Sequence, residues 1–320
     1  YAEATLAQKT SIKDSEGNIQ GGPVYYITRA FQGRLGKFLA GFFAVAIILA
    51  LGFFGCMVQS NSIGSTIHTA FGIPSWIVGG VLVVICAFIF MGGVDRKYVP
   101  ATFFMIFRYA FQPQAIIGGG LGAALKIAVS QGAKRGLFSN EAGMGSTPHA
   151  HALAQVKNAH EQGTVAMAGV FIDTFVVLTL NALVIISTLY TADGPLAGGY
   201  TGGVVETLNK ANLAQTAFGV VYGEKLGSAF VAVCLFFFAF STILGWNLFA
   251  KINVNYLFGP KAIKPFLMIA LVFIFLGTLA SNDLVWELSD MFNQLMVIPN
   301  AIALFALTGV VVTSMKEDGG

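Results

Sequence analysis

Long apolar stretches alternate with short polar ones along the whole chain. Seven of the apolar stretches are long enough to cross a bilayer as helices, which takes about 20 consecutive apolar residues. We predict spans at about 37–60, 73–93, 99–125, 163–190, 226–250, 263–281 and 291–314, the third of them broken. The pattern therefore predicts an all-α polytopic membrane protein with one transmembrane domain over residues 1–320.

Lys and Arg collect on alternate sides of these spans, and the positive-inside rule orients the spans accordingly. We assign residues 126–162, which include Lys134 and Arg135, to a cytoplasmic segment. The acidic turn predicted at Ser281–Asp290 falls outside. Arg96 falls inside as well, so an even number of crossings must separate it from Arg135.

The apolar stretch at 99–125 is the only candidate between those two inside segments, which leaves the topology one crossing short. Either this stretch dips into the bilayer and returns, or a helix of about 20 residues is absent here. Pro100, Arg108 and Pro113 disfavour a single clean span, and we favour the absent helix. The chain opens at Tyr1 in what looks like a helix end, so we also expect sequence to precede it.

The composition agrees with lipid burial. Hydrophobic residues make up 56% of the chain and charged residues only 10%, with a mean hydropathy of +0.74. A soluble domain has too little core to bury that much apolar surface. The net charge of +3 comes from loops between spans and gives no sign of nucleic acid binding. Cys56, Cys86 and Cys234 lie in apolar segments without zinc-like spacing, so we expect buried free thiols.

One helical stripe of small and polar residues follows the first span. Gly52, Gly55, Gln59, Ser62 and Thr66 are spaced by three and four residues in alternation, which puts them on one face. Glycines there let a ligand approach the backbone, and Gln59 offers both a donor and an acceptor. The alternative is a packing stripe in which Gln59 joins two helices. Spacing does not decide between the two.

A second polar feature interrupts the stretch at 99–125. Pro113 is followed by the three consecutive glycines Gly118, Gly119 and Gly120, and each glycine disfavours a helix by about 1 kcal/mol relative to alanine. Unwound backbone at membrane depth occurs where it lies inside the protein or lines a cavity. Broken helices of this kind form substrate and ion sites in secondary transporters. The alternative is a loop at the membrane surface.

Further polar residues lie inside predicted spans. Asp173 is about ten residues into one span, where an ionisable side chain is usually functional. Ser241 and Thr242 offer hydroxyl oxygens, which hard cations prefer, and Trp246 follows one turn later. Trp246 is a candidate pocket wall, with an interfacial belt residue as the alternative.

The polar run before the fourth span contains Glu141, His149 and His151. A His-x-His pair points its rings about 200° apart on a helix, and no third strong ligand has suitable spacing. We therefore predict no metal site beyond one for Na⁺.

Five motifs, in order along the chain, resemble the alanine or glycine:cation symporter family. They are Gly21–Ile27, Val58–Ser62, Arg135–Ser146 with Ala150–Ala152, Val170–Thr174 and Phe238–Trp246. The resemblance implies a LeuT-like inverted-repeat fold of five helices plus five. It implies a symporter of the cell (inner) membrane that imports alanine or glycine with Na⁺ or H⁺ by alternating access. It implies no enzyme activity and no cofactor apart from the coupling ion.

The resemblance also implies which residues form the site. In such folds the substrate lies between the first, third, sixth and eighth helices. We expect it to be held by Gln59, Gly118, Gly119, Gly120 and Trp246. We expect the cation to be held by Ser241 and Thr242 on the eighth helix, with Asp173 on the seventh as a further candidate. The family's first helix, most of its second and its fifth are missing from this sequence.

Two other functions remain open at this point. A cation channel predicts a continuous polar pore, whereas the polar stripes here are short and clustered. A membrane protein that has lost transport activity would fit the missing helices.

Overall fold

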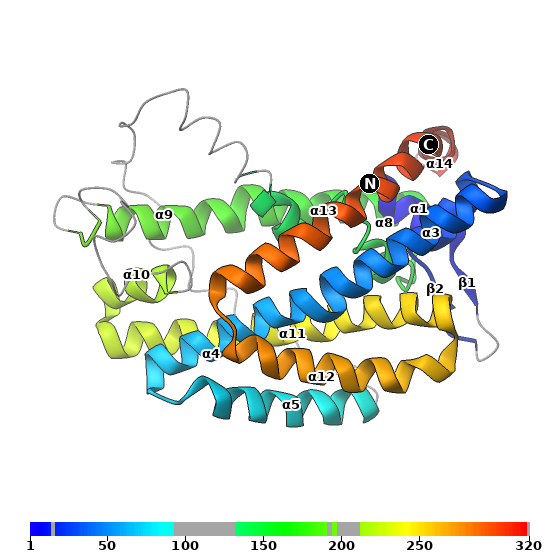
Figure 1. Cartoon of the computed structure of the whole chain (residues 1–320). Coiled ribbons are helices and arrows are strands. Elements are labelled where there is room, and N and C mark those ends of the chain that lie inside the picture. Colours follow the sequence, from blue (N-terminus) through cyan, green and yellow to red (C-terminus); the bar gives the residue numbers. More distant parts are fainter. Residues whose placement is uncertain (14–16, 93–131, 133, 191–193, 197–211, 319–320) are drawn as a thin grey trace.

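A computed structural model of the chain describes residues 1–13, 17–92, 132, 134–190, 194–196 and 212–318. Helices make up nearly all of this part (Figure 1). The first half contains α1 (Ala2–Thr10), α2 (Pro23–Ala30), α3 (Gly33–Ile47), η1 (Ile48–Gly55), α4 (Cys56–Phe71) and α5 (Ser75–Gly92). The second half contains α7 (Pro148–His151), α8 (Ala159–Phe171), η3 (Ile172–Val177), α9 (Leu178–Leu189), α10 (Leu213–Tyr222), α11 (Glu224–Phe258), η4 (Pro260–Ala262), α12 (Ile263–Leu279), α13 (Asn282–Ala306) and α14 (Thr308–Asp318). A short antiparallel hairpin joins β1 (Ile12–Lys13) to β2 (Ile19–Gln20).

The helix that runs from α3 through η1 to α4 is the centre of the bundle. It is 39 residues long and ends at Gly72, whose left-handed φ of 68° closes the helix. A Cβ atom at Gly55 would lie 2.7 Å from the Trp246 ring, and one at Gly52 would lie 2.7 Å from Ala250. The glycines of the stripe therefore let this helix pack closely against α11, as the packing alternative predicted.

Four helices in the described part are long and apolar enough to cross a membrane. They are Gly33–Phe71, Ala159–Leu189, Glu224–Phe258 and Pro260–Leu279. These four helices overlap the spans predicted at 37–60, 163–190, 226–250 and 263–281. The helix α5 overlaps the span predicted at 73–93, while the broken span at 99–125 lies outside the described residues.

The last predicted span, 291–314, is divided between two helices in the structure. Its residues belong to α13 and α14, which meet at an angle of 56°. The turn predicted at Ser281–Asp290 is wrong, because α13 begins at Asn282 with the Ser281 hydroxyl as its N-cap. Acidic residues in the first turns of α13 lower its hydropathy, so the hydropathy pattern does not reveal this part of the helix.

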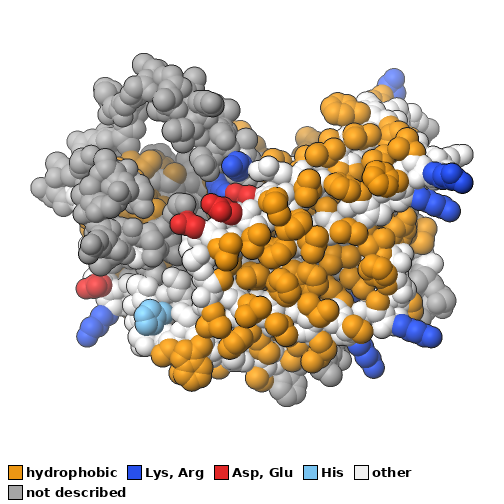
Figure 2. Space-filling view, in the orientation of Figure 1, with side chains coloured by type: hydrophobic (Ala, Val, Ile, Leu, Met, Phe, Trp, Pro, Cys, Tyr) orange, Lys and Arg blue, Asp and Glu red, His pale blue; other side chains and the backbone are white. Residues whose placement is uncertain are grey.

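Large apolar side chains cover much of the described surface (Figure 2). Phe38, Phe238, Phe258 and Phe305 are all at least two-thirds exposed, which suits contact with lipid. Lys and Arg gather at the right-hand end of this view. The start of α3 and the connection from α11 to α12 lie at that same end (Figure 1). Most of the basic residues in this view thus lie at one end of the bundle, which agrees with the positive-inside rule.

Candidate functional site

A broken segment enters the middle of the bundle at residues 134–149. Residues 134–140 are helical, residues 141–147 form turns, and α7 resumes the helix. Glu141 has a φ of 55°, and Gly143 and Gly145 have φ of 85° and 84°. A left-handed glutamate is a sparsely populated conformation that stores about 1–3 kcal/mol, and such residues cluster at functional sites. This unwound stretch is the central feature of the site.

The broken segment runs alongside α11 and α13, in the same direction as both. Against α11, Glu141 accepts a hydrogen bond from Nε1 of Trp246, and His149 accepts one from Asn253. Against α13, Arg135 pairs with Asp290, and Asn300 donates to the carbonyl of Gly143 at 3.0 Å. The segment therefore passes through the bundle along its neighbours.

This course corrects the predicted topology. The ion pair between Arg135 and Asp290 brings together two residues that we had assigned to opposite sides of the membrane. Those two assignments exclude each other, so at least one is wrong. If the shared side is the outside, one crossing between Arg96 and Arg135 suffices and no absent helix is needed; if it is the inside, the parity argument stands.

Glu3 of α1 stabilises the unwound turns. Its Oε2 accepts the backbone N–H of Gly143 at 2.8 Å, and its Oε1 accepts that of Gly145 at 2.9 Å. Oε1 also accepts Nδ2 of Asn300 at 2.7 Å, and Asn300 accepts the hydroxyl proton of Tyr26. One buried carboxylate thus holds backbone donors that a broken helix leaves unpaired.

Glu141 is the second acidic side chain of the unwound stretch. Its Oε1 is the acceptor for the Trp246 indole, while its Oε2 is buried without a hydrogen-bond partner in the described part of the chain. The hydroxyl of Ser146 lies close to this carboxylate. Trp246, only 3% exposed, joins the broken segment to α11 and to the glycine stripe.

Aromatic rings continue from Trp246 toward Arg135. Phe138 meets Trp246 edge-on with ring centroids 5.5 Å apart, and it meets Trp286 at 4.7 Å. The Arg135 guanidinium lies 4.4 Å from the centre of the Trp286 ring, a cation–π contact. An ion pair and three rings therefore cover the helical end of the broken segment.

The histidines have structural contacts. His149 is fully buried, donates from Nδ1 to the Ser146 carbonyl at 2.8 Å, and stacks with Phe249 at 5.4 Å. Nε2 of His149 accepts from Asn253 at 2.8 Å, so both ring nitrogens are occupied. Burial lowers the pKa of His151, and its Nδ1 bonds Gln162 at 2.7 Å. These hydrogen bonds fix the end of the broken segment.

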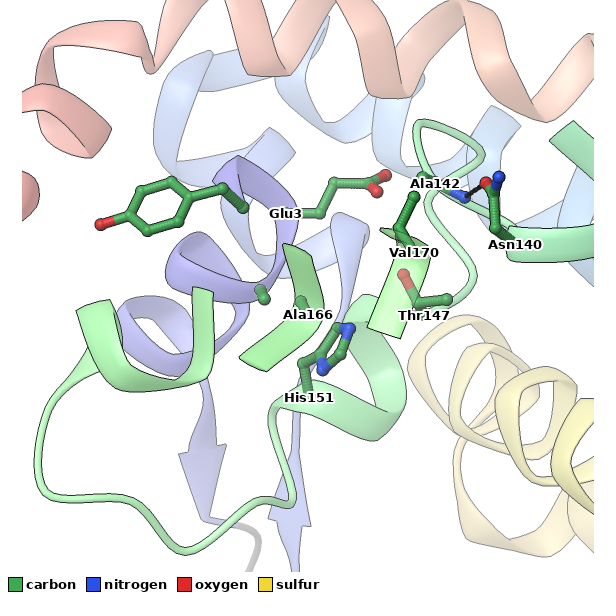
Figure 3. A pocket seen from close by; sticks show the side chains of 9 residues that line it. Glu3, Asn140, Ala142, Thr147, His151, Ala166 and Val170 are labelled. Carbon is green, nitrogen blue, oxygen red and sulfur yellow. Dashed lines mark hydrogen bonds between the residues drawn. The ribbon is translucent and has the colours of Figure 1, made fainter. Parts of the chain in front are cut away.

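A small cavity of about 40 Å³ lies beside the unwound stretch. In Figure 3, Glu3, Asn140, Thr147 and His151 surround it, with the Val170 side chain of α8 opposite. A space of this size and polarity is large enough to hold water, which takes about 10–15 Å³ measured in this way.

The predicted substrate residues have different surroundings. Trp246 lies at the unwound stretch, as described above. Gln59 is partly exposed and makes no hydrogen bond to the described residues. Gly118, Gly119 and Gly120, where we predicted the broken helix, lie outside the described residues. The unwound segment that the structure describes comes about twenty residues later.

The predicted cation residues do not meet in one place. Ser241 is exposed, and both Ser241 and Thr242 donate to the Phe238 carbonyl at 2.9 Å within α11. Asp173 lies in the π-helical turn η3, where it accepts a hydrogen bond from Ser139 at 2.8 Å. Asn140 donates to the neighbouring Thr174 at 3.1 Å. Asp173 thus contacts the broken segment, whereas Ser241 and Thr242 are bonded to their own helix.

Sequence reasoning missed Glu3, Ser146 and Asn300 as site residues. Two signals were available in the printed chain: the Gly-x-Gly at Gly143 and Gly145 beside a glutamate, and an asparagine next to Pro299 in an apolar helix. Both patterns are hostile to a regular membrane helix and therefore mark places where the backbone needs polar partners.

Comparison with known proteins gives consistent matches. The model of the sodium:alanine symporter family matches in two stretches, residues 1–98 and 95–318. The sodium/alanine symporter AgcS of Methanococcus maripaludis is 34% identical over 99% of this chain and 73% of the relative. A putative sodium/proton-dependent alanine carrier, YrbD of Bacillus subtilis, is 34% identical over 99% and 70%. A probable sodium/glutamine symporter of that species, GlnT, is 33% identical over 99% and 68%.

Proposed function

The chain belongs to the sodium:alanine symporter family, and from that membership we propose that it imports alanine or glycine with Na⁺ or H⁺ by alternating access. It is an integral membrane protein of a transporter family and not an enzyme. Its relatives are named for alanine and glutamine carriage and for sodium or proton dependence. The amino acid and the ion are therefore the parts of this function that experiment must decide.

The buried unwound stretch at residues 141–147 is the observation that carries the proposal. A break of this kind leaves backbone N–H and C=O groups free to meet a carboxylate and a cation. Trp246 lies against the same stretch, and Gln59 is one turn beyond Gly55, which packs on the Trp246 ring. The amino acid is then bound between these two side chains, and the large ring leaves room for a small substrate only.

The proposed architecture is a LeuT-like inverted repeat in which residues 134–149 form the broken sixth helix. Two observations support this reading. The broken segment runs between α11 and α13, the eighth and tenth helices in that fold. Asp173, which would lie on the seventh helix, contacts Ser139 and remains a candidate cation ligand, together with Ser241 and Thr242.

An internal helix absent from this sequence remains part of the proposal, on grounds independent of topology. The alignment with AgcS spans 345 positions, although the chain has 320 residues. The relative therefore has at least 25 residues without a counterpart here, enough for one span of about 20 residues. The family match divides at residues 95–98, next to the junction where we expected the gap. The same observation favours a second candidate function, a membrane protein that has lost transport.

Uptake into proteoliposomes tests the proposed function. Labelled alanine should enter saturably under an inward Na⁺ or proton gradient, and unlabelled glycine should compete. Glutamine at equal concentration is the matched competitor of larger size. Gradient-driven uptake would support the symporter. If no amino acid accumulates although the protein is folded and inserted, the symporter proposal fails. The second candidate, a membrane protein that has lost transport, then takes its place. Flux of Na⁺ without amino acid would instead identify a channel.

A further inference from the structure

Two carboxyl groups lie in the interior without a basic partner among the described residues. Glu3 is 8% exposed, and Glu141 has a buried carboxyl oxygen. The described part of the chain contains one ion pair, Arg135 with Asp290, and neither glutamate belongs to it. Glu3 is compensated by three N–H donors. Glu141 has one N–H donor, from Trp246; the Ser146 hydroxyl lies close to its carboxylate, and the negative charge of Glu3 acts against it.

Two buried oxygen atoms near each other lack a hydrogen bond of regular geometry. Oε2 of Glu141 and Oγ of Ser146 are both buried, and neither makes a hydrogen bond of regular geometry to a described residue. The Ser146 hydroxyl lies near enough to the carboxylate to interact with it, so the two oxygens face one another across a contact that is longer or less well aligned than a regular hydrogen bond. Ser146 is 0% exposed, so bulk water does not reach its hydroxyl. Buried polar atoms in native proteins are nearly always paired, and a buried charge without compensation is strongly unfavourable. The carboxylate oxygen therefore needs a positive partner, and the Ser146 oxygen is placed to contact the same partner.

We propose that Oε2 of Glu141 and Oγ of Ser146 bind a monovalent cation, either Na⁺ or a proton. A single positive charge neutralises the one uncompensated carboxylate. Na⁺ accepts carboxylate and hydroxyl oxygens as ligands because it is a hard cation. A proton on Oε2 would instead be donated to the Ser146 oxygen. The described residues contain no group of three His, Cys, Asp or Glu side chains suited to a metal ion, which argues against a divalent ion.

The site differs from the cation residues expected on the α11 face, Ser241 and Thr242. It lies on the unwound stretch, and the carboxylate that would bind the cation also accepts the Trp246 indole proton. Neutralising Glu141 weakens that charge-assisted hydrogen bond and so changes how Trp246 is held. The idea that cation binding changes the substrate site through Trp246 rests on the proposed function. Cation binding to Glu141 and Ser146 does not depend on that function, and it is measured without transport.

Trp246 fluorescence reports the state of Glu141 directly. The background variant carries Trp76→Phe and Trp286→Phe, which leaves Trp246 as the one tryptophan, since the chain has three. Purified protein in detergent is titrated with Na⁺ replacing choline at constant pH, and separately with pH in choline alone. Glu141→Gln keeps a hydrogen-bond acceptor for the indole but removes the charge. Glu287→Gln is the matched control, because that glutamate is exposed on α13.

We expect a saturable fluorescence change in one of the two titrations, unchanged in Glu287→Gln and lost in Glu141→Gln. A response to Na⁺ at constant pH identifies Na⁺ as the cation, and a response to pH alone identifies a proton. Ser146→Ala should move the midpoint of the responding titration by about tenfold, the loss of one interaction with a charged group. It serves as the second variant if Glu141→Gln does not fold.

A response that survives in folded Glu141→Gln, or a midpoint that Ser146→Ala leaves unchanged, would overturn the site. The absence of a fluorescence change in both titrations would also overturn the site. Loss of amino-acid uptake with an intact cation response would leave this site standing and remove only the proposed transport function, so the two failures are distinguishable.

Discussion

The Glu3 carboxylate holds the unwound turns in place, and replacing it with glutamine should loosen one identified amide. Oε1 has two donors, Gly145 N–H and Asn300 Nδ2, whereas Oε2 has one, Gly143 N–H. Glutamine keeps the most bonds by placing its carbonyl oxygen at the Oε1 position. Its NH₂ group then faces the N–H of Gly143, so that hydrogen bond is lost and a buried donor is left unpaired.

The magnitude follows from the charge on the acceptor. A hydrogen bond to a charged group contributes about 1.5–3 kcal/mol, so we take about 2 kcal/mol for the Gly143 amide. That corresponds to roughly 30-fold faster hydrogen exchange through local opening. Hydrogen-exchange mass spectrometry of peptides covering residues 141–147 measures it, with Glu287→Gln as the control. Equal protection of Gly143 in Glu3→Gln and wild type would refute this role of Glu3.

The other predictions concern positions around the same site. A Cβ atom at Gly22, where φ is 130°, would collide with the His149 ring. Gly33 also has a positive φ, of 74°, but has open space around it. Gly22→Ala should therefore lower the thermal midpoint of unfolding clearly more than the control Gly33→Ala does. Gln59→Ala should weaken alanine binding by about three- to tenfold, the worth of one hydrogen bond; equal affinity removes Gln59 from the pocket. Asp173→Asn should change the cation or pH dependence of uptake, and unchanged dependence on both would contradict a role in coupling.

The long helices could be predicted from sequence because lipid imposes a simple rule. A helix in a bilayer needs an unbroken apolar run, and such runs at 226–250 and 263–281 can be seen without any tertiary information. The N-terminal half of α13 escaped because Asp283, Glu287 and Asp290 give its first turns the appearance of an acidic loop.

The location of the unwound stretch could not be predicted because the relevant partners are distant in sequence. Glu3 and Gly143 are 140 residues apart, and nothing local indicates that they meet. Three consecutive glycines at Gly118–Gly120 are the stronger local signal for a broken helix. Nothing local in the sequence shows that Arg135 and Asp290 form an ion pair, so each is assigned to a side of the membrane separately.

The family resemblance did specify Trp246 as a site residue, and its motif also contained Glu141 without giving it a role. A glutamate is normally expected at the surface, because burying its charge is unfavourable. The physical reason it is tolerated is a pair of compensations: an indole donor from α11 and, by our inference, a bound monovalent cation.

Alanine binding to the purified protein tests the central claim most directly, namely that the unwound stretch and Trp246 form the substrate site of a cation-coupled symporter. Labelled alanine binding is measured at equilibrium in Na⁺ and in choline, at two pH values, for wild type and Trp246→Ala. We predict saturable binding that requires Na⁺ or low pH and a dissociation constant at least about tenfold higher in folded Trp246→Ala. Alanine binding of equal affinity in the variant, or independent of both cations, would contradict the account.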